Sequence, residues 1–388
     1  MRLAFVVQRY GLEVAGGAEL HCRWHAERLA RTHSVEVFTT QARDYVEWRH
    51  GYPGGTTIVN GIPVHRFPVE RYRSPRDFAA ASGRVFGVPH SREDEEAWVQ
   101  ANGPFAPALV EAVAAARDRF DAFLFYSYRY YQSFHGLPRV AEKAILVPTA
   151  EADEAIHLGL SRELFRRARG IVYLTEEERE LVEAVSGRAS AHWAVIGSGL
   201  EVPESEPAPT VLERFHLERP FLLYVGRIEG RKGLPSLFTY FRNFLASSHA
   251  DVDLVLAGRA EMAIPEHPHI RHVGFVSESE KLALLRGSRA LVVPSPYESL
   301  SIVMLEAWKH GVPVLANGRC RVLLGQCRRA GAGLAYDGYE EFAEALTLLL
   351  ERPQLRAALG RQGRAYVERE SAWERVLGKL EGLFAEAL

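Results

Sequence analysis

Two glutamates separated by seven residues stand in the stretch of the sequence best placed to do chemistry, residues 294–313. We expect an apolar strand just before this stretch and, within it, a helix that ends at Gly311. Glu298 would then precede the helix N-terminus, and Glu306 would lie within the helix. Both carboxylates would reach the carboxyl end of a parallel sheet, where open α/β folds bind ligands.

A glycine turn with two cations, Arg227 and Lys232, follows an earlier apolar segment. Such a turn, leading into a helix, suits a diphosphate because backbone N–H groups, the helix dipole, a guanidinium and an ammonium all favour oxygen-rich negative charge. The residue order is not that of a Walker A loop. Taken alone, a plain surface turn is an equally good interpretation.

A glycine pair, Gly16-Gly17, stands between an expected strand at residues 3–7 and an expected helix at residues 18–31. No GxGxxG pattern is present, so the dinucleotide fingerprint is absent. Glycine lets backbone approach a ligand closely, and a loop that simply needs glycine is the alternative. In the helix, His21 and His25 have a zinc-compatible spacing, but without an HExxH pattern ordinary helix-face histidines are favoured.

Four tyrosines between residues 126 and 131 follow another expected strand, and His135 lies just beyond them. Aromatic side chains at strand ends suit the stacking of sugars or bases, and they are as common in the packing of a domain edge. The two interpretations are equally favoured for these tyrosines.

Strand and helix patterns alternate twice along the 388 residues, which exceed one ordinary core. We therefore expect an α/β protein of two Rossmann-like, doubly wound parallel-sheet domains that face each other across a cleft. The first covers residues 1–199 and the second residues 200–370, and the helix 371–388 is expected to pack back on the first. A proline-rich, acidic linker is expected at residues 202–209.

Charge and composition exclude several classes of protein. A formal net charge of −2 argues against a nucleic-acid binder. Three cysteines without CxxC spacing argue against a disulfide framework or structural zinc and favour the cytoplasm. No segment is apolar over a membrane-spanning length. Scattered arginines in the first domain could meet an acidic acceptor or an anionic membrane, but a solvated face is favoured: Arg66, Arg71, Arg73, Arg76, Arg84 and Arg92.

The motifs of the second half follow one another in a fixed order that ends with Glu298, Glu306-Ala307 and Gly311-Val-Pro-Val314. Before them come Gly226-Arg227, Lys232-Gly233, Leu256-Ala-Gly258, Val273-Gly-Phe-Val276 and Pro294-Ser295. In this order they resemble the donor-binding half of the retaining GT-B glycosyltransferases of the family 4 type. The first half resembles that group more loosely, through the Gly16-Gly17 loop and its strand order.

The resemblance implies an enzyme that moves a sugar from a nucleotide-diphosphate sugar, most often a UDP- or GDP-sugar, to a sugar or glycoconjugate acceptor in glycan, polysaccharide or glycoconjugate biosynthesis. It implies retention of the anomeric configuration and no metal or other cofactor. The donor would bind the second domain and the acceptor the first. The expected location is the cytoplasm, with peripheral contact of the first domain at the inner face of the membrane as an option. No oligomeric state is predicted.

The resemblance also implies roles for single residues. Arg227 and Lys232 would neutralise the leaving diphosphate, and Glu298 would act at the anomeric carbon as nucleophile or as electrostatic stabiliser. Glu306 would accept hydrogen bonds from the ribose. The remaining donor-side residues are Gly226, Phe275, Val276, Ser299, Leu300 and Ser301, and the acceptor-side residues are Gly16, Gly17, His135, Glu151 and Asp153.

This chain departs from the family pattern at two places. Ser299-Leu-Ser301 replaces the common Gly-Phe-Gly, and Thr149 to Asp153 stand where a histidine is common. Glu151 or Asp153 would take over acceptor contacts there, or the reaction is arranged differently. Three alternatives follow: a helix-capping Glu298 with a solvated Glu306, a nucleotide-sugar epimerase on the same plan, and a catalytically degenerate nucleotide-sugar-binding protein.

Overall fold

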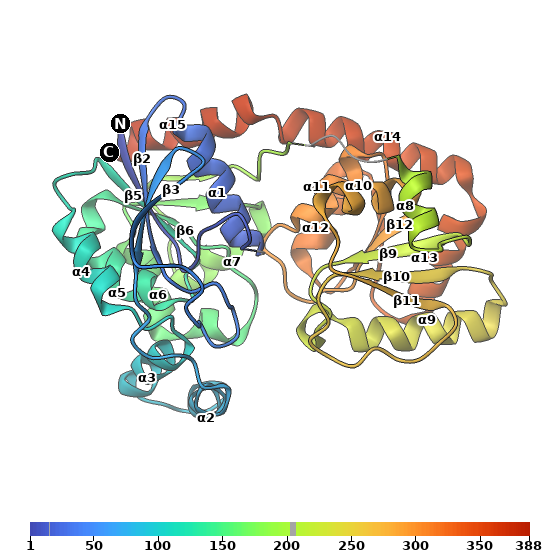
Figure 1. Ribbon diagram of the computed structural model, residues 1–388, viewed down its shortest axis with the longest axis horizontal. Helices are drawn as coiled ribbons and strands as arrows, with labels where there is room; N and C mark the ends of the chain where they lie inside the picture. Colours follow the sequence, from blue (N-terminus) through green and yellow to red (C-terminus); the bar gives the residue numbers. More distant parts are fainter. Residues whose placement is uncertain (15, 202–206) are drawn as a thin grey trace. The chain divides into compact units, whose positions relative to one another are not determined.

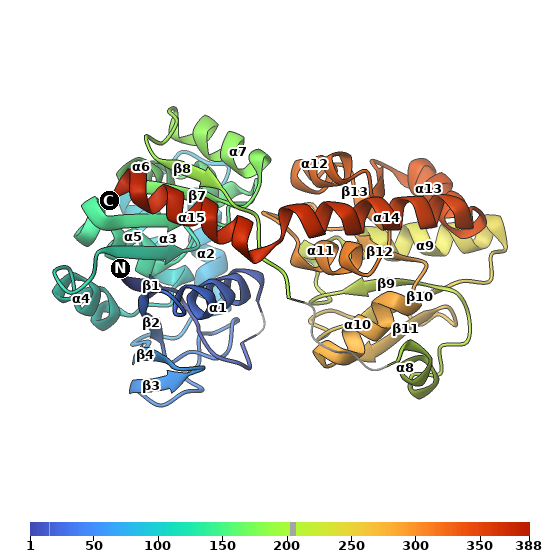
Figure 2. The same ribbon diagram turned by 90° about the horizontal axis from the view of Figure 1, so that it is seen from above.

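The chain divides into two compact units in a computed structural model that describes residues 1–14, 16–201 and 207–388 (Figures 1 and 2). Unit 1 comprises Met1–Gly199 and Glu374–Leu388, and unit 2 comprises Leu200–Trp373. Each unit contains one largely parallel sheet with helices packed against it. The predicted pair of Rossmann-like domains is therefore confirmed. Residues 202–206 of the expected linker lie outside the described residues.

The sheet of unit 1 has the strand order β3-β4-β2-β1-β5-β6-β7-β8, in which β3 and β4 pair antiparallel and the other pairs are parallel. Its strands are β1 (Arg2–Val6), β2 (Ser34–Thr40), β3 (Gly55–Val59), β4 (Ile62–Phe67), β5 (Ala122–Tyr126), β6 (Ala144–Val147), β7 (Gly170–Tyr173) and β8 (Trp193–Val195). The central strands β1, β5 and β6 are almost wholly buried apolar runs, as expected for parallel strands covered on both faces.

The helices of unit 1 include α15, the last helix of the chain, which returns to this unit (Figures 1 and 2). Leu380, Leu383 and Phe384 of α15 are buried, and Arg169 Nε donates a hydrogen bond of 2.6 Å to the carbonyl of Ala387. The helices are α1 (Gly17–Leu29), α2 (Pro75–Val85), α3 (Arg92–Asn102), α4 (Pro107–Ala115), α5 (Tyr131–Gly136), η1 (Leu137–Lys143), η2 (Glu154–His157), α6 (Gly159–Arg167), α7 (Glu176–Ser186) and α15 (Trp373–Ala387).

The sheet of unit 2 is entirely parallel, with the order β11-β10-β9-β12-β13-β14. Its strands are β9 (Phe221–Val225), β10 (Asp253–Ala257), β11 (Ile270–Gly274), β12 (Ala290–Val293), β13 (Val314–Asn317) and β14 (Gly333–Tyr336). The chain winds outward from β9 to β11 and then outward again from β12 to β14 on the other side. The strand order therefore reverses between β9 and β12, which is where such sheets bind ligands.

Helices cover both faces of this sheet, with α9 and α13 on one face and α10, α11 and α14 on the other (Figure 1). The helices of unit 2 are α8 (Ala208–Arg214), η3 (Gly230–Lys232), α9 (Leu234–Ser248), α10 (Glu278–Gly287), α11 (Ile302–Lys309), α12 (Arg321–Ala330), α13 (Tyr339–Glu351) and α14 (Pro353–Glu370).

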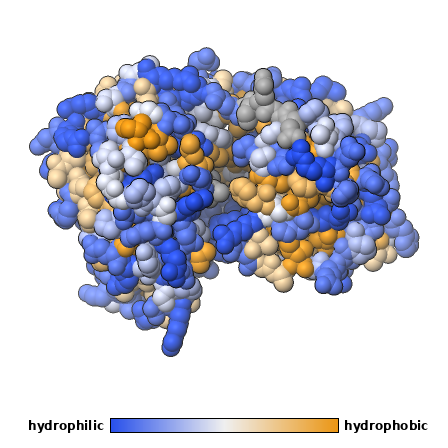
Figure 3. Space-filling model, viewed as in Figure 1, coloured by the Kyte–Doolittle hydropathy of each residue, from blue (hydrophilic) through white to orange (hydrophobic). Residues whose placement is uncertain are grey.

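Hydrophilic residues cover much of the face of each unit seen in Figure 3, with apolar residues interspersed. Among residues 1–14, 16–201 and 207–388, none of the helices combines the length and the apolar character needed to cross a bilayer.

Candidate active site

The loops that follow β9 and β10 touch backbone to backbone at the carboxyl edge of the unit 2 sheet. Gly226 has a φ of 148° and Gly258 a φ of 142°. A Cβ atom on Gly258 would lie 2.0 Å from the carbonyl oxygen of Gly226. Only glycine fits both the conformation and the contact, so this pair fixes where the cationic turn begins.

The other end of that turn is pressed against the loop after β12. Gly233 has a φ of 78°, and a Cβ atom there would lie 2.1 Å from the carbonyl oxygen of Pro294. Asn317, at the end of β13, donates from Nδ2 to the same carbonyl at 3.0 Å. Three adjacent strands thus fix the positions of the two loops that carry the predicted site residues.

Lys232 and Glu298 meet between these loops. Lys232 Nζ lies 2.8 Å from Glu298 Oε1, and the two side chains are 27% and 16% exposed. The structure therefore brings together a cation and a carboxylate that are 66 positions apart in the sequence. A partly exposed ion pair at the carboxyl edge of a parallel sheet is accessible to a charged ligand.

Arg227 stands on the same turn as Lys232. Its Nη2 atom lies 3.2 Å from Glu229, and its side chain is 39% exposed. Tyr224 on β9 donates from Oη to the carbonyl of Arg227 at 2.7 Å, which fixes the backbone of the turn. Both predicted cations thus lie on one turn, each partly exposed and each beside a carboxylate.

The residues that depart from the family pattern lead from Glu298 into α11. Ser301 occupies the N-cap position with a φ of 67°, and its side chain makes no capping hydrogen bond. Gln326 on α12 donates from Nε2 to the carbonyl of Leu300. The interpretation of Glu298 as a helix cap is wrong, because Ser301 is the N-cap residue and the Glu298 carboxylate pairs with Lys232.

Glu306 lies buried on α11 with a cation beside it. Lys281 Nζ on α10 lies 2.8 Å from Glu306 Oε1, and the side chains are 11% and 7% exposed. Burial raises the pKa of Glu306, and the ammonium of Lys281 opposes that rise. Burial disfavours the ammonium, but the carboxylates of Glu306 and Glu278 hold the pKa of Lys281 above its usual value. The interpretation of Glu306 as a solvated helix residue is therefore wrong.

Lys281 is a site residue that the sequence analysis missed. It stands in α10 directly before four buried apolar residues, 282–285. A lysine on the apolar side of a short helix is the signal that points to a buried acidic partner. The pattern does not say which acid that partner is.

Phe275 follows β11 and is 78% exposed, although it is a large aromatic residue. It lies at the same carboxyl edge as the cationic turn, because β11, β10 and β9 are neighbours in the sheet. Val276 follows it, and Ser277 then starts α10 with a capping box to Glu280. The residues predicted to border a nucleobase therefore lie at the same carboxyl edge as the cationic turn, with Phe275 largely exposed.

Comparison with known proteins identifies the family of unit 2. Residues 213–366 match the family described as Glycosyl transferases group 1. Unit 2 is a group 1 glycosyltransferase domain. The chain is 24% identical over 399 residues to a D-inositol 3-phosphate glycosyltransferase of Acidothermus cellulolyticus, covering 96% of this chain and 86% of that protein.

Two further similarities are to a mannosyltransferase and to a protein whose structure contains UDP and glucose. A GDP-mannose-dependent monoacylated alpha-(1-6)-phosphatidylinositol monomannoside mannosyltransferase of Corynebacterium glutamicum is 28% identical over 187 residues, covering 44% of this chain and 49% of that protein. The structure of Anabaena Alr3699/HepE in complex with UDP and glucose superposes with a TM-score of 0.69 at 14% identity, covering 100% of both chains. The protein is a glycosyltransferase with the GT-B fold.

On the predicted acceptor side of this glycosyltransferase, Gly16 packs against a buried ion pair. Arg9 Nη2 lies 2.6 Å from Glu19 Oε1, with side chains 5% and 6% exposed. A Cβ atom on Gly16 would lie 2.3 Å from Glu19 Oε2, whereas one on Gly17 would meet nothing within 4 Å. Gly16 is therefore needed for packing, and Gly17 is the member of the pair that faces open space.

Asp153 and Glu151 differ in how exposed their side chains are. Asp153 is buried, accepts a hydrogen bond of 2.8 Å from Tyr128 Oη, and pairs with Arg129. Glu151 lies 3.8 Å from Arg129 with a side chain that is 26% exposed. Asp153 thus anchors the loop after β6, while Glu151 is the more accessible carboxylate.

His135 stands apart from these carboxylates. It lies on α5, its ring centroid is 4.3 Å from that of Tyr131, and its Nε2 is 3.6 Å from Glu96 on α3. Burial lowers its pKa. The structure therefore places His135 against α3 rather than beside the loop after β6. Of the neighbouring tyrosines, Tyr126 and Tyr128 are fully buried, as the packing interpretation predicts.

His21 and His25 are buried helix residues with stacked rings 3.9 Å apart. His21 Nε2 lies 3.0 Å from the carbonyl of Gly197, and His25 Nδ1 lies 2.8 Å from the carbonyl of His21. Burial lowers the pKa of both and brings that of His21 to about 4. In the part of the chain that the structure describes, no group of three possible ligands could hold a metal ion.

Proposed function

We propose that this glycosyltransferase moves a sugar from a nucleotide-diphosphate sugar to a sugar or glycoconjugate acceptor with retention of configuration and without a metal cofactor. The observation that carries the proposal is the pair Lys232–Glu298, 2.8 Å apart, beside Arg227 at the carboxyl ends of β9 and β12. Cations suited to a diphosphate and a carboxylate suited to a sugar thus occupy one edge of the sheet.

The cations would stabilise the leaving group. As the bond between sugar and diphosphate breaks, negative charge grows on the diphosphate, and preorganised cations lower the free energy of that state. Arg227 and Lys232 would supply the positive charge that a divalent metal supplies in other phosphate chemistry. The donor would separate Lys232 from Glu298, so that the ammonium turns to the diphosphate and the carboxylate turns to the sugar.

Glu298 would act at the anomeric carbon, as nucleophile or as stabiliser of an oxocarbenium-like transition state. Glu306 would accept hydrogen bonds from the ribose hydroxyls, held in place by Lys281. Phe275 and Val276 would border the base. The chain is similar to a GDP-mannose-dependent enzyme and to a protein whose structure contains UDP and glucose. These two similarities support a UDP- or GDP-sugar as donor.

The acceptor would bind unit 1 near Gly17 and Glu151, since both are more open than Gly16 and Asp153. We place the reaction in glycan, polysaccharide or glycoconjugate synthesis in the cytoplasm or at the inner face of the membrane. The chain's three cysteines, all within the described residues, are buried free thiols, which is compatible with a reducing compartment.

Donor turnover tests the proposal. UDP-, GDP- and ADP-sugars are offered with a panel of sugar and glycoconjugate acceptors to the wild type, to Glu298→Gln and to Glu306→Gln. We expect Glu298→Gln to lower kcat by about 10²–10³, as loss of a transition-state contact does, and Glu306→Gln mainly to raise KM for the donor. Glu344→Gln, an exposed glutamate on α13, is the matched control and should behave as the wild type.

Three outcomes would count against the proposal. If both active-site variants keep full turnover, the site assignment is wrong. Donor conversion without any acceptor would indicate an epimerase instead. Inversion at the anomeric carbon, read by NMR of the product, would exclude the retaining mechanism.

A further inference from the structure

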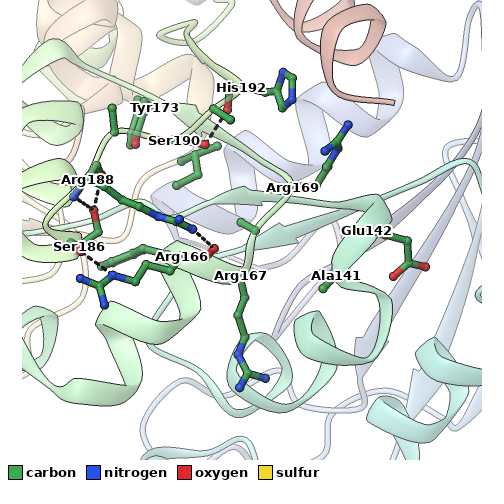
Figure 4. A pocket seen from close by; sticks show the side chains of 15 residues that line it. Ala141, Glu142, Arg166, Arg167, Arg169, Tyr173, Ser186, Arg188, Ser190 and His192 are labelled. Carbon is green, nitrogen blue, oxygen red and sulfur yellow. Dashed lines mark hydrogen bonds between the residues drawn. The ribbon is translucent and has the colours of Figure 1, made fainter.

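A pocket of about 450 Å³ lies in unit 1 at the amino ends of β7 and β8 (Figure 4). Its walls come from the end of α6, the end of α7 and the residues that directly precede the two strands, including Arg169 and His192. The loop with Glu151 and Asp153 follows β6 and therefore lies at the opposite, carboxyl edge of the same sheet. The pocket is thus separate from the proposed acceptor region.

The pocket is strongly cationic. Four arginines line it together with a single carboxylate, Glu142, which is 2.7 Å from Arg117 outside the lining. The arginines are Arg166, Arg167, Arg169 and Arg188, and Figure 4 shows them around the pocket. The formal charge of the whole chain is −2, so this concentration of positive charge is local rather than a general property of the protein.

Backbone contacts hold three of these arginines in place. Arg166 Nε donates to the carbonyl of Ser186 at 2.7 Å, and Arg188 Nη2 donates to the carbonyl of Arg166 at 2.7 Å. Arg169 Nε donates to the carbonyl of Ala387 at 2.6 Å. Each of these bonds uses one of the five N–H groups of a guanidinium and neutralises no charge. The fold therefore orders these three cations through neutral carbonyls, and no ion pair within the described part of the chain compensates them.

The pocket also has an apolar side, formed by Phe165, Ile171 and Tyr173 with several alanines. Its volume is in the range of small-molecule sites. Guanidinium groups bind phosphate through paired, charge-assisted hydrogen bonds, and several of them favour a multiply charged ligand. We propose that this pocket binds a small, soluble phosphorylated molecule, with its phosphate on the arginines and its organic part on the apolar side.

Titration calorimetry of the full-length protein with inorganic pyrophosphate tests the site. The pocket variant is Arg167→Gln with Arg188→Gln, and the control is Arg31→Gln with Arg139→Gln, which removes two exposed charges of unit 1 elsewhere. The donor site also attracts pyrophosphate, but it contributes equally to all three proteins. We expect wild type and control to bind alike and the pocket variant to lose about tenfold or more in affinity for one binding event.

A thermal unfolding curve without ligand checks that the pocket variant is folded. If the loss of the Arg188 contact lowers the stability of the pocket variant, the single variant Arg167→Gln, at an exposed residue, is compared with Arg139→Gln. Arg167→Gln is then expected to bind pyrophosphate more weakly than Arg139→Gln. Equal affinity in pocket and control variants would overturn the proposal. A second result would also overturn it. In that result the wild type sediments with phosphatidylglycerol vesicles and not with phosphatidylcholine vesicles, and the pocket variant loses this sedimentation but keeps its affinity for pyrophosphate.

Discussion

At the scale of single residues, the pair Glu306–Lys281 shows which features of a site can be predicted from sequence patterns and which cannot. The order of the motifs predicts Glu306 as a ribose ligand, and the structure places it on α11, the helix that follows the loop after β12. Its burial and its partner could not be predicted, because they depend on how α10 and α11 pack side by side. An isolated buried carboxylate would be unfavourable, so Lys281 is the residue that makes Glu306 tolerable there.

Lys281→Met is expected to destabilise unit 2 by about 3–5 kcal/mol, since it leaves the carboxylate of Glu306 buried without its cation. The double variant Lys281→Met, Glu306→Leu should recover much of that stability but bind donor poorly. Urea unfolding of both variants measures the difference. An unchanged midpoint for Lys281→Met would show that the pair contributes nothing to the fold.

Gly258→Ala is expected to lower the free energy of unfolding by about 1–3 kcal/mol, because its φ of 142° and the 2.0 Å approach to Gly226 both oppose a side chain. It should also weaken donor binding, since the turn with Arg227 must shift. Thermal unfolding measures the change in stability, and titration calorimetry with a nucleoside diphosphate measures the change in binding. Gly378→Ala, with open space around its Cβ inside α15, is the control and should not lower the free energy of unfolding, because alanine favours a helix interior more than glycine does.

At the scale of elements, runs of apolar residues predict strands at residues 122–126, 221–225, 290–293 and 333–336. β5, β9, β12 and β14 have the predicted bounds. The hairpin β3–β4 and helices α2 and α3 were not predicted, because half-exposed edge strands and short amphipathic helices have weak apolar patterns.

Thr175 and Glu178 have the sequence spacing of a capping box at the start of α7, and the contacts of Glu178 beyond that box show a limit of local patterns. Thr175 accepts from the N–H of Glu178, as predicted. The carboxylate of Glu178 also accepts from the N–H groups of Leu174 and Ala150, each at 2.5 Å. Ala150 belongs to the loop after β6, a tertiary partner that the local sequence does not reveal.

Acid is expected to destabilise unit 2 through His310, at the end of α11. Burial lowers its pKa to about 4, helped by Arg286 and Arg364. The unfolded chain therefore takes up this proton at higher pH than the folded one. The contribution of His310 to the free energy of unfolding is therefore fully present above about pH 6.5 and is lost as the pH falls through about 4.

Unfolding curves at several pH values test this prediction. The difference in the free energy of unfolding between the wild type and His310→Gln should change against the wild type as the pH falls from 6.5 to 4. The variant His157→Gln, at an exposed histidine of unit 1, is measured as the control. A difference for His310→Gln that is constant with pH would contradict the assignment.

At the scale of the whole molecule, unit 1 is not one continuous stretch of chain. It ends at Gly199 and is completed by Glu374–Leu388, and α15 contacts β7 through Gly170 and Ala387. The helix at residues 371–388 was expected to pack back on the first domain, and in the structure Val376, Leu380 and Leu383 of α15 are buried.

Truncation after Trp373 is expected to weaken unit 1 and to leave unit 2 intact. Leu380→Ala alone should cost about 2–5 kcal/mol, as for other fully buried leucines. Hydrogen exchange followed by mass spectrometry should show faster exchange in β6 and β7 and unchanged protection in β9 and β12. Equal protection of β7 in truncated and full-length chains would show that α15 does not support the unit 1 sheet.

The central claim is that unit 2 binds the diphosphate of a nucleotide sugar through Lys232 and Arg227. The most direct measurement is titration calorimetry with UDP, GDP and ADP on the wild type, on Lys232→Met and on the control Lys309→Met, which removes a surface ammonium of the same unit. We predict that at least one nucleotide binds wild type and control equally and binds Lys232→Met about tenfold or more weakly. Binding that is unaffected by Lys232→Met, or no binding of any of the three nucleotides, would contradict the claim.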